Sequence, residues 1–325
     1  HLRAKLLDSA YKRWGEKYTK VISDFVVPPK TSLIDKMRHV AFHTKLGLFN
    51  PKQILLQSQT LFLIGAISPK YALGSVKAGW AMRHLDLLPG DSAVLDRVAK
   101  SAVKLNPQWT EAEFKESYNL LRQTGFDEVG GQVSYRNDIG NFKLTQGKTN
   151  QFLSWGATFF NWSERNVLLA AWNTAYKEYA DKFPKLKGRM TPEDAKFIMT
   201  RAEDLSINMR RNAHSRWQEG AMSGVTQFWG YSGRLFDLYT GTRLTKAERA
   251  RMIAMNSLLY GIPVGLTPYA PFWPCRDALR QDLMESGMVT DEGIADIAMN
   301  GVFAASMSGI TGEQFDVPAV WGPNA

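Results

Sequence analysis

The chain has 325 residues and a formal net charge of +9, with 44% hydrophobic and 22% charged residues. This composition excludes a disordered chain, in which apolar residues are scarce, and the length predicts two or three packed subdomains. The single cysteine, Cys275, excludes a disulfide framework and any zinc or iron-sulfur site made from several cysteines of this chain.

Residues 1–125 predict a subdomain of short helices, because apolar residues recur there at helical spacing. Several helix starts carry their own signal, either a cap residue directly before proline or a capping box. These starts are Asn50-Pro51, Ser68-Pro69, and Thr110 followed by Glu113. We expect helices over 3–23, 32–47, 51–66, 69–86, 91–104 and 110–124.

Residues 126–148 predict a Gly-rich loop or linker. Gly and polar residues dominate this stretch, and strand-like alternation is confined to a patch near Gly130 to Phe142. Little or no sheet is therefore expected in the protein.

Residues 149–260 predict a second subdomain built on a long helix. Its helix starts are marked by Thr191-Pro192 and by the capping box of Thr245 with Glu248. We expect helices over 149–182, 191–239 and 246–259, the second of which is long for a globular protein.

Residues 261–325 predict a break rich in Pro and Gly, followed by a helical hairpin over 273–286 and 291–309. The longest apolar stretches, Ile54 to Ile67 and Met252 to Ala270, are too short or too interrupted for a membrane-spanning helix. The expected fold class is all-α, with many helices, two or three helical subdomains and one long helix.

The charge is unevenly distributed along the chain. Residues 1–60 carry 11 Lys and Arg against 4 Asp and Glu, whereas residues 241–325 carry 6 against 9. A basic front and an acidic rear are explained by contacts between subunits or by a polyanion at one end. A solvated surface is the plain alternative.

No catalytic or metal site is predicted. His39 and His43 have the spacing of a metal-binding pair, but no third ligand is evident nearby. No phosphate-binding loop and no Gly-x-Ser-x-Gly motif occurs, and the paired carboxylates stand mostly at expected helix starts. Cys275 is interpreted as a buried structural thiol, and no cofactor is expected.

Arginines interleaved with aromatic residues form the most suggestive pattern. Such residues can pair with phosphates and stack on bases, or can anchor a helix at a subunit contact or a membrane interface. These alternatives stay open for the candidate contact residues Arg210, Arg211, Arg216, Trp217, Trp229 and Arg234.

The segment Asn208 to Gly241, NMRRNAHSRWQEGAMSGVTQFWGYSGRLFDLYTG, resembles the C-terminal third of the large internal virion proteins of short-tailed bacteriophages. In that family a Gly-rich apolar hairpin and a small-residue helix follow, which correspond here to Ala254 to Ala270 and Ile294 to Gly309. Val40 to Ser68 is similar to an earlier apolar hairpin of the family, punctuated by Asn and Gln. The resemblance covers about two thirds of the chain as an order of features.

The resemblance implies a structural protein of the virion interior, a homo-oligomer stacked with other internal core proteins above the portal, with genomic DNA passing by. It implies that the protein is ejected and helps to form a DNA-conducting channel across the host envelope, where it meets the inner membrane. The family's peptidoglycan-cleaving pattern does not occur here, so no enzyme activity is expected. The alternatives are a helical nucleic-acid-binding scaffold that uses the basic residues of 1–60, or a hydrolase whose cleft unites residues distant in sequence.

Overall fold

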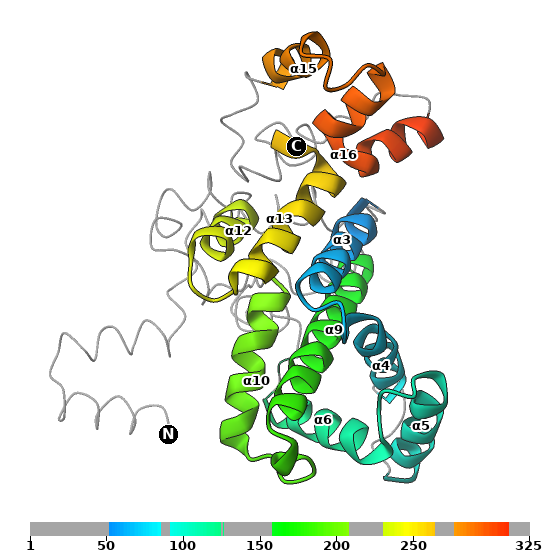
Figure 1. The fold of residues 1–325 in the computed structure, drawn as a ribbon. Coiled ribbons are helices and arrows are strands. Elements are labelled where there is room, and N and C mark those ends of the chain that lie inside the picture. The colour runs from blue at the N-terminus through cyan, green and yellow to red at the C-terminus, as the bar shows by residue number, and fades with distance from the viewer. Residues whose placement is uncertain are drawn as a thin grey trace, which may run out of the picture. The chain divides into compact units, whose positions relative to one another are not determined.

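The computed structural model describes residues 52–85, 92–124, 126, 158–207, 230–263 and 276–311. Throughout these ranges the regular secondary structure is helical and no strand occurs, which confirms the all-α fold class (Figure 1). Apart from Thr158, the described residues belong to one compact unit formed by Asn50–Val129 and Phe159–Ala325.

Most described helices lie within a few residues of the predicted ranges. The helix predicted from residue 69 begins only at Ala72. A turn precedes it, in which the Ser68 carbonyl oxygen accepts hydrogen bonds from the N–H groups of Tyr71 and Ala72. The bounds are α3 Lys52–Ile67, α4 Ala72–Leu85, α5 Ser92–Leu105, α6 Glu111–Thr124, α9 Thr158–Lys182, the 3-10 helix η3 Pro184–Leu186, α10 Pro192–Leu205, α12 Gly230–Thr240, α13 Lys246–Tyr260, α15 Arg276–Glu285 and α16 Glu292–Thr311.

Helix α9 is the central element of this unit. Every residue from 167 to 177 is buried, including the polar residues Asn173, Thr174 and Lys177, so the helix is enclosed on all sides. On one side Gly79 of α4 allows close packing, because a Cβ atom there would stand 3.0 Å from Leu169 Cβ. On another side Trp172 donates from Nε1 to the carbonyl oxygen of Ser117 on α6, at 3.1 Å.

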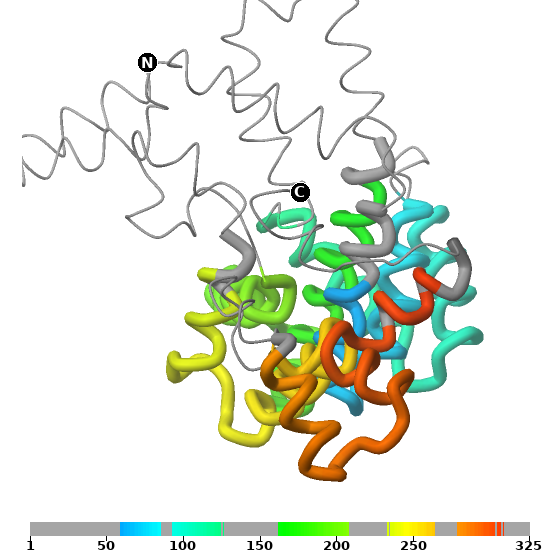
Figure 2. The backbone as a smooth tube through the Cα atoms, turned by 90° about the horizontal axis from the view of Figure 1, so that it is seen from above, coloured from blue at the N-terminus to red at the C-terminus, as the bar shows by residue number. Residues whose placement is uncertain are grey.

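Helix α13 contacts both α3 and α16, and in Figure 2 its yellow-orange trace lies beside the orange-red trace of α16. Arg251 of α13 donates to the carbonyl oxygens of Ala66 (2.7 Å) and Ile67 (2.8 Å). These are among the carbonyl groups that a helix leaves unpaired at its C-terminus. An arginine of α13 therefore caps the end of α3.

Two glycines allow α13 and α16 to approach at backbone distance. Gly261 ends α13 with a φ of +91°, and Gly301 kinks α16 with a φ of +79°. A Cβ atom on Gly261 would collide with the backbone of Met299, and one on Gly301 with the backbone of Leu259. Both positions therefore require glycine, for conformation and for space.

The predicted helix over 191–239 is not continuous: it is interrupted after Leu205, residues 208–229 lie outside the described residues, and residues 230–239 are helical again in α12. Helix α10 ends at Leu205, where the N–H of Ser206 donates to Ala202, and Ile207 then turns to a φ of +48°. Ile207 is a buried β-branched residue, so core packing compensates for this strained conformation. The predicted bend at Gly220 and Gly224 lies outside the described residues.

The predicted linker 126–148 also lies outside the described residues, apart from Phe126. The predicted division into 1–125, 149–260 and 261–325 stays a prediction. Within the described ranges, no helix combines the length and the apolarity that crossing a membrane requires.

Candidate functional site

Three capped helix starts converge on three consecutive residues of α9, Lys177, Glu178 and Tyr179. The start of α6 reaches Lys177, that of α10 reaches Tyr179, and that of α13 reaches Glu178 through Arg201. We call this set of contacts the α9 junction.

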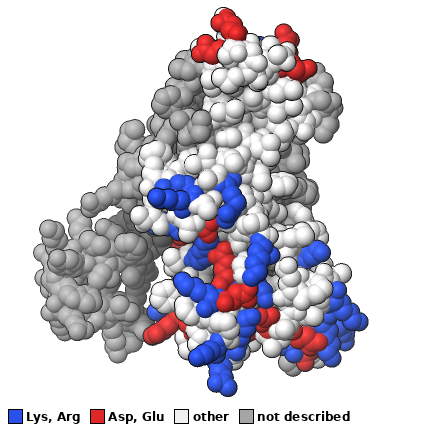
Figure 3. All heavy atoms as spheres, viewed as in Figure 1, with Lys and Arg blue, Asp and Glu red and all other residues white. Residues whose placement is uncertain are grey.

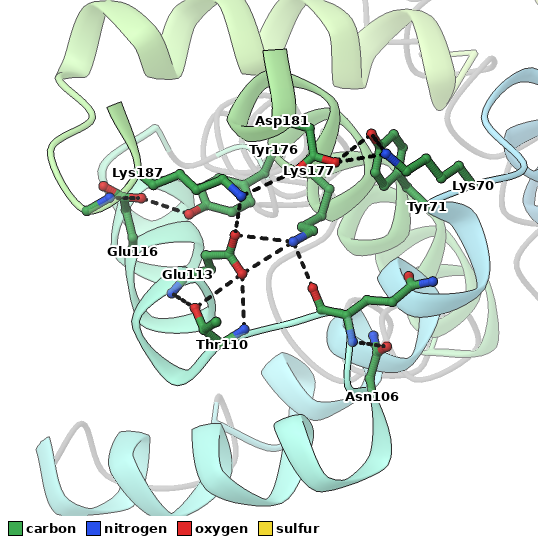
Figure 4. Close-up of polar contacts among 12 residues, drawn as sticks. Lys70, Tyr71, Asn106, Thr110, Glu113, Glu116, Tyr176, Lys177, Asp181 and Lys187 are labelled. Atoms are coloured by element: carbon green, nitrogen blue, oxygen red, sulfur yellow. Dashed lines mark hydrogen bonds and ion pairs between the residues drawn. The ribbon is translucent and has the colours of Figure 1, made fainter. Parts of the chain in front are cut away.

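The first contact of the junction is centred on Glu113, the capping-box acid of α6 (Figure 4). Its carboxylate accepts from the Thr110 N–H at 3.0 Å, and the Glu113 N–H donates back to the Thr110 hydroxyl at 3.2 Å. The same carboxylate lies 3.2 Å from Lys177 Nζ and 3.0 Å from Lys187 Nζ. Lys177 also donates to the Gln108 carbonyl oxygen at 2.8 Å, so this buried ammonium group is well satisfied.

The electrostatics of Glu113 favour its charged form. Burial acts to raise the pKa of this carboxyl, but the hydrogen bonds from Thr110 and Lys187 and the charge of Lys177 together hold it below its usual value. The hydrogen bond to Glu113 in turn raises the pKa of Lys187. Glu113 and Lys187 therefore remain charged near neutral pH.

Glu116, one turn further along α6, fixes the connection between α9 and α10. Its carboxylate accepts from the backbone N–H groups of Gly188 (2.9 Å) and Met190 (3.0 Å) and from the Tyr176 hydroxyl (2.7 Å). Burial and this hydrogen bond raise the pKa of Tyr176, so the phenol stays protonated and keeps donating. One carboxylate thus replaces the pairing that the loop backbone lacks.

Asp181 extends the network toward the turn before α4. It accepts from the Tyr71 hydroxyl at 2.8 Å and from Lys70 Nζ at 3.0 Å, and it lies 3.3 Å from Lys187 Nζ. Burial acts to raise the pKa of Asp181, but the hydrogen bonds from Tyr71, Lys70 and Lys187 outweigh it and lower the pKa to about 2.

The second contact of the junction involves Asp194, the capping-box acid of α10. Asp194 accepts from the Tyr179 hydroxyl at 2.6 Å while it pairs with the N–H of Thr191 at 2.7 Å. The hydrogen bond to Asp194 raises the pKa of Tyr179 to about 12.

In the third contact, Arg201 bridges two acids from different helices. It binds Glu178 of α9 at 2.7 Å and Glu248, the capping-box acid of α13, at 2.5 Å. Each of the three capping acids therefore has a second function as an acceptor between helices.

The chemistry of this network is that of an electrostatic clamp. The acids whose pKa is lowered are unprotonated near neutral pH, and Lys187 is protonated, so these groups are poorly matched to proton transfer there. They are well matched to holding helices together. A search of the described residues finds no group of three His, Cys, Asp or Glu side chains that could hold a metal ion.

The candidate contact residues predicted from the sequence lie elsewhere. Arg210, Arg211, Arg216, Trp217 and Trp229 are outside the described residues, as are His39, His43 and Cys275. Arg234 lies on α12, where the structure describes its backbone alone. Their predicted roles stay predictions.

The sequence identified Thr110 with Glu113 and Thr245 with Glu248 as helix starts but missed their second partners. Glu113 and Lys177 are 64 positions apart, so no local pattern joins them. Lys177 stands between Tyr176 and Glu178, and nothing in this stretch marks the lysine as buried or points to its partner.

Comparisons of the chain with protein-family models, with curated proteins and with solved structures find no match.

Proposed function

We propose that this chain is a structural internal core protein of a short-tailed phage virion, which is ejected and helps to form a DNA-conducting channel across the host cell envelope. The observation that carries the proposal is the packing of α3 against α13. Helix α3 falls in the first apolar segment that resembles the family, and α13 enters the second at Ala254.

Polar side chains within these two apolar segments are buried and find partners on other helices. The Tyr260 hydroxyl of α13 donates to Gln59 Oε1 of α3. Asn256 Nδ2 donates to the Tyr239 hydroxyl of α12 at 2.6 Å. Polar groups that pair between otherwise apolar helices are also a means by which helices associate in a bilayer.

The same segments contain unpaired polar atoms and exposed apolar side chains that a different packing of the helices could use. Gln59 Nε2 and Asn256 Oδ1 are buried without a hydrogen-bond partner among the described residues. On the outer side of α13 Leu258 is 51% exposed, and Ile262, which follows the helix, is 36% exposed. Repacking against neighbouring subunits or lipid would cover the apolar groups and pair the polar ones.

The modular construction of the unit suits passage through a narrow tail. The capping boxes of α10 and α13 fix the start of each helix by local contacts, so these segments can re-form without waiting for distant parts of the chain. We infer that the protein is transported in a partly unfolded form and reassembles afterwards.

The assembly part of the proposal is tested by measuring the mass of the full 325-residue chain by native mass spectrometry and light scattering, with electron microscopy of the particles. We expect a closed ring or a stacked multimer. A chain that stays monomeric at micromolar concentration, with and without duplex DNA, contradicts the proposal.

The membrane part is tested by flotation with vesicles of phosphatidylethanolamine and phosphatidylglycerol. We expect the wild-type chain to float and Leu258→Glu to float at least several-fold less, because a charge on α13 opposes insertion. Phe197→Glu, at a 66% exposed position of α10, is the matched control and should float like the wild type. Failure of the wild type to float under any condition removes the membrane from the proposal.

A further inference from the structure

The turn between α15 and α16 presents an apolar side chain surrounded in sequence by acids. Met288 is 77% exposed, more than any other large hydrophobic residue in the described ranges. Glu285 precedes it by three positions, and Asp291 and Glu292 follow within four, all of them exposed. On the face shown in Figure 3, acidic side chains gather over this end of the unit.

A backbone hydrogen bond and an ion pair connect the two sides of this turn. Gly287 takes a φ of +71°, which lets the N–H of Val289 donate back to the carbonyl oxygen of Leu283 at 3.2 Å and so closes the end of α15. Arg280 and Asp296 join the two helices by an ion pair of 3.0 Å. The backbone at Met288 is therefore spanned by a capping hydrogen bond, while its side chain stays exposed.

A hollow of about 340 Å³ lies between α4 and the end of α5. Its walls include Leu73 (71% exposed) and Leu105 (69% exposed), which rank directly after Met288 in exposure among the large hydrophobic residues of the described ranges. Pockets of this volume hold small ligands, so a single methionine side chain can enter. The hollow and the turn thus contain the three most exposed large apolar side chains of those ranges.

One basic side chain lines this hollow, and others follow along the helix that ends beside it. Lys77 lines it, and the exposed residues Arg97, Lys100 and Lys104 follow one face of α5 at spacings of three and four positions. The one acidic residue of α5, Asp96, is paired with Lys115 at 2.5 Å. None of the four basic side chains has an ion pair with a described carboxylate, and Figure 3 shows basic residues over this region.

The turn and the hollow complement each other in both shape and charge. One is an apolar projection flanked by acids, and the other is an apolar recess flanked by bases. Within the unit the two lie at opposite ends in Figure 1, so one copy cannot bring them together. Two copies can, and the pair then leaves one turn and one hollow open for further copies.

We propose that copies of this chain associate head to tail, with Met288 of one copy seated in the Leu73–Leu105 hollow of the next and Glu285 and Glu292 facing Lys77 and Lys104. Such a heterologous contact produces a closed ring or an open stack according to the rotation that it imposes. The inference rests on the proposed assembly function and adds to it the surface by which subunits join.

The test is a charge reversal with rescue, on the full chain, with subunit association measured by analytical ultracentrifugation. Lys77→Glu/Lys104→Glu and Glu285→Lys/Glu292→Lys should each weaken association at least tenfold, because like charges then face each other. An equimolar mixture of the two variants should recover association, since each reversed surface meets its complement. Met288→Ser should weaken association by about tenfold without removing its salt dependence.

The matched control is Lys185→Glu/Lys196→Glu, which reverses two exposed lysines on η3 and α10 and changes the net charge equally. It should associate like the wild type. If both lysine variants lose association equally, or if neither loses it, the head-to-tail contact is wrong while the assembly function stands. A wild-type chain that stays monomeric contradicts both the head-to-tail contact and the assembly function.

A polyanion is the competing occupant of the basic surface. Duplex DNA of random sequence is therefore titrated into the same variants at about 50 and 200 mM salt. If Lys77→Glu/Lys104→Glu abolishes salt-dependent DNA binding but leaves self-association intact, the surface serves nucleic acid and the proposed contact is overturned.

Discussion

The α9 junction and the contact between α13 and α16 hold the same unit together by opposite means. The junction uses ionised side chains that reach across gaps between helices, such as Lys177 to Glu113. The α13–α16 contact uses the lack of a side chain, since Gly261 and Gly301 let two backbones touch. The first depends on protonation and on each partner's presence, whereas the second depends on space and on a backbone conformation that glycine permits.

The largest effect is expected from Lys177→Met. The change leaves buried Glu113 with a weaker set of partners and removes a donor from the Gln108 carbonyl, so it should lower the free energy of unfolding by about 3 to 5 kcal/mol. Lys115→Met is the matched control at the exposed pair with Asp96 and should cost at most about 1 kcal/mol. Equal losses in urea unfolding would show that the junction does not depend on its buried charge.

Gly301→Ala should break the other contact at a cost of about 2 to 4 kcal/mol. The added Cβ meets the backbone of Leu259 and must also adopt a positive φ. Gly287→Ala separates these causes, because Gly287 has a similar φ of +71° but open space around it. It should cost only about 1 to 2 kcal/mol, and a loss as large as that of Gly301→Ala would exclude close approach as the reason.

Acid should weaken the junction and spare the glycine contact. The pKa of Asp181 is about 2 in the folded chain and 3.8 in the reference state, so the stability it contributes is fully present above the higher value. This contribution is lost as the pH falls through the lower value. The stability difference between wild type and Asp181→Asn, about 1 to 2 kcal/mol at pH 7, should therefore narrow as the pH falls from about 5 to about 2.

Asp296→Asn, at the exposed pair with Arg280, provides the comparison for this experiment. It should change stability by less than about 0.5 kcal/mol at every pH tested. A gap between wild type and Asp181→Asn that stays constant with pH contradicts the assigned protonation behaviour.

Helix starts could be predicted from the sequence because their signals are local. Thr110, Thr191 and Thr245 each stand beside the residues that they bond to. The end of α10 could not be predicted, because the left-handed turn at Ile207 is stabilised by packing of a buried side chain rather than by a breaker residue. The kink at Gly301 was also missed, because a glycine inside an apolar helical pattern does not show which other backbone approaches it, here that of Leu259.

The α9 junction was only half visible in the sequence. The acids Glu113 and Glu248 were found as capping residues, but their partners Lys177 and Arg201 are separated from them along the chain. A capping box already accounts for the presence of an acid at its position, so the local pattern does not predict a second partner for that acid. The candidate residues between Arg210 and Trp229 were chosen by composition and lie outside the described residues.

The contacts of three helix starts with Lys177, Glu178 and Tyr179 support the first turn of each of those helices. Forming the first turn is the costly step of making a helix, and here the first turns of α6, α10 and α13 are the ones tied to the interior. In a partly unfolded chain, any first turn that stays bound to α9 would serve as the starting point for its helix. Regrowth would then start from turns already made.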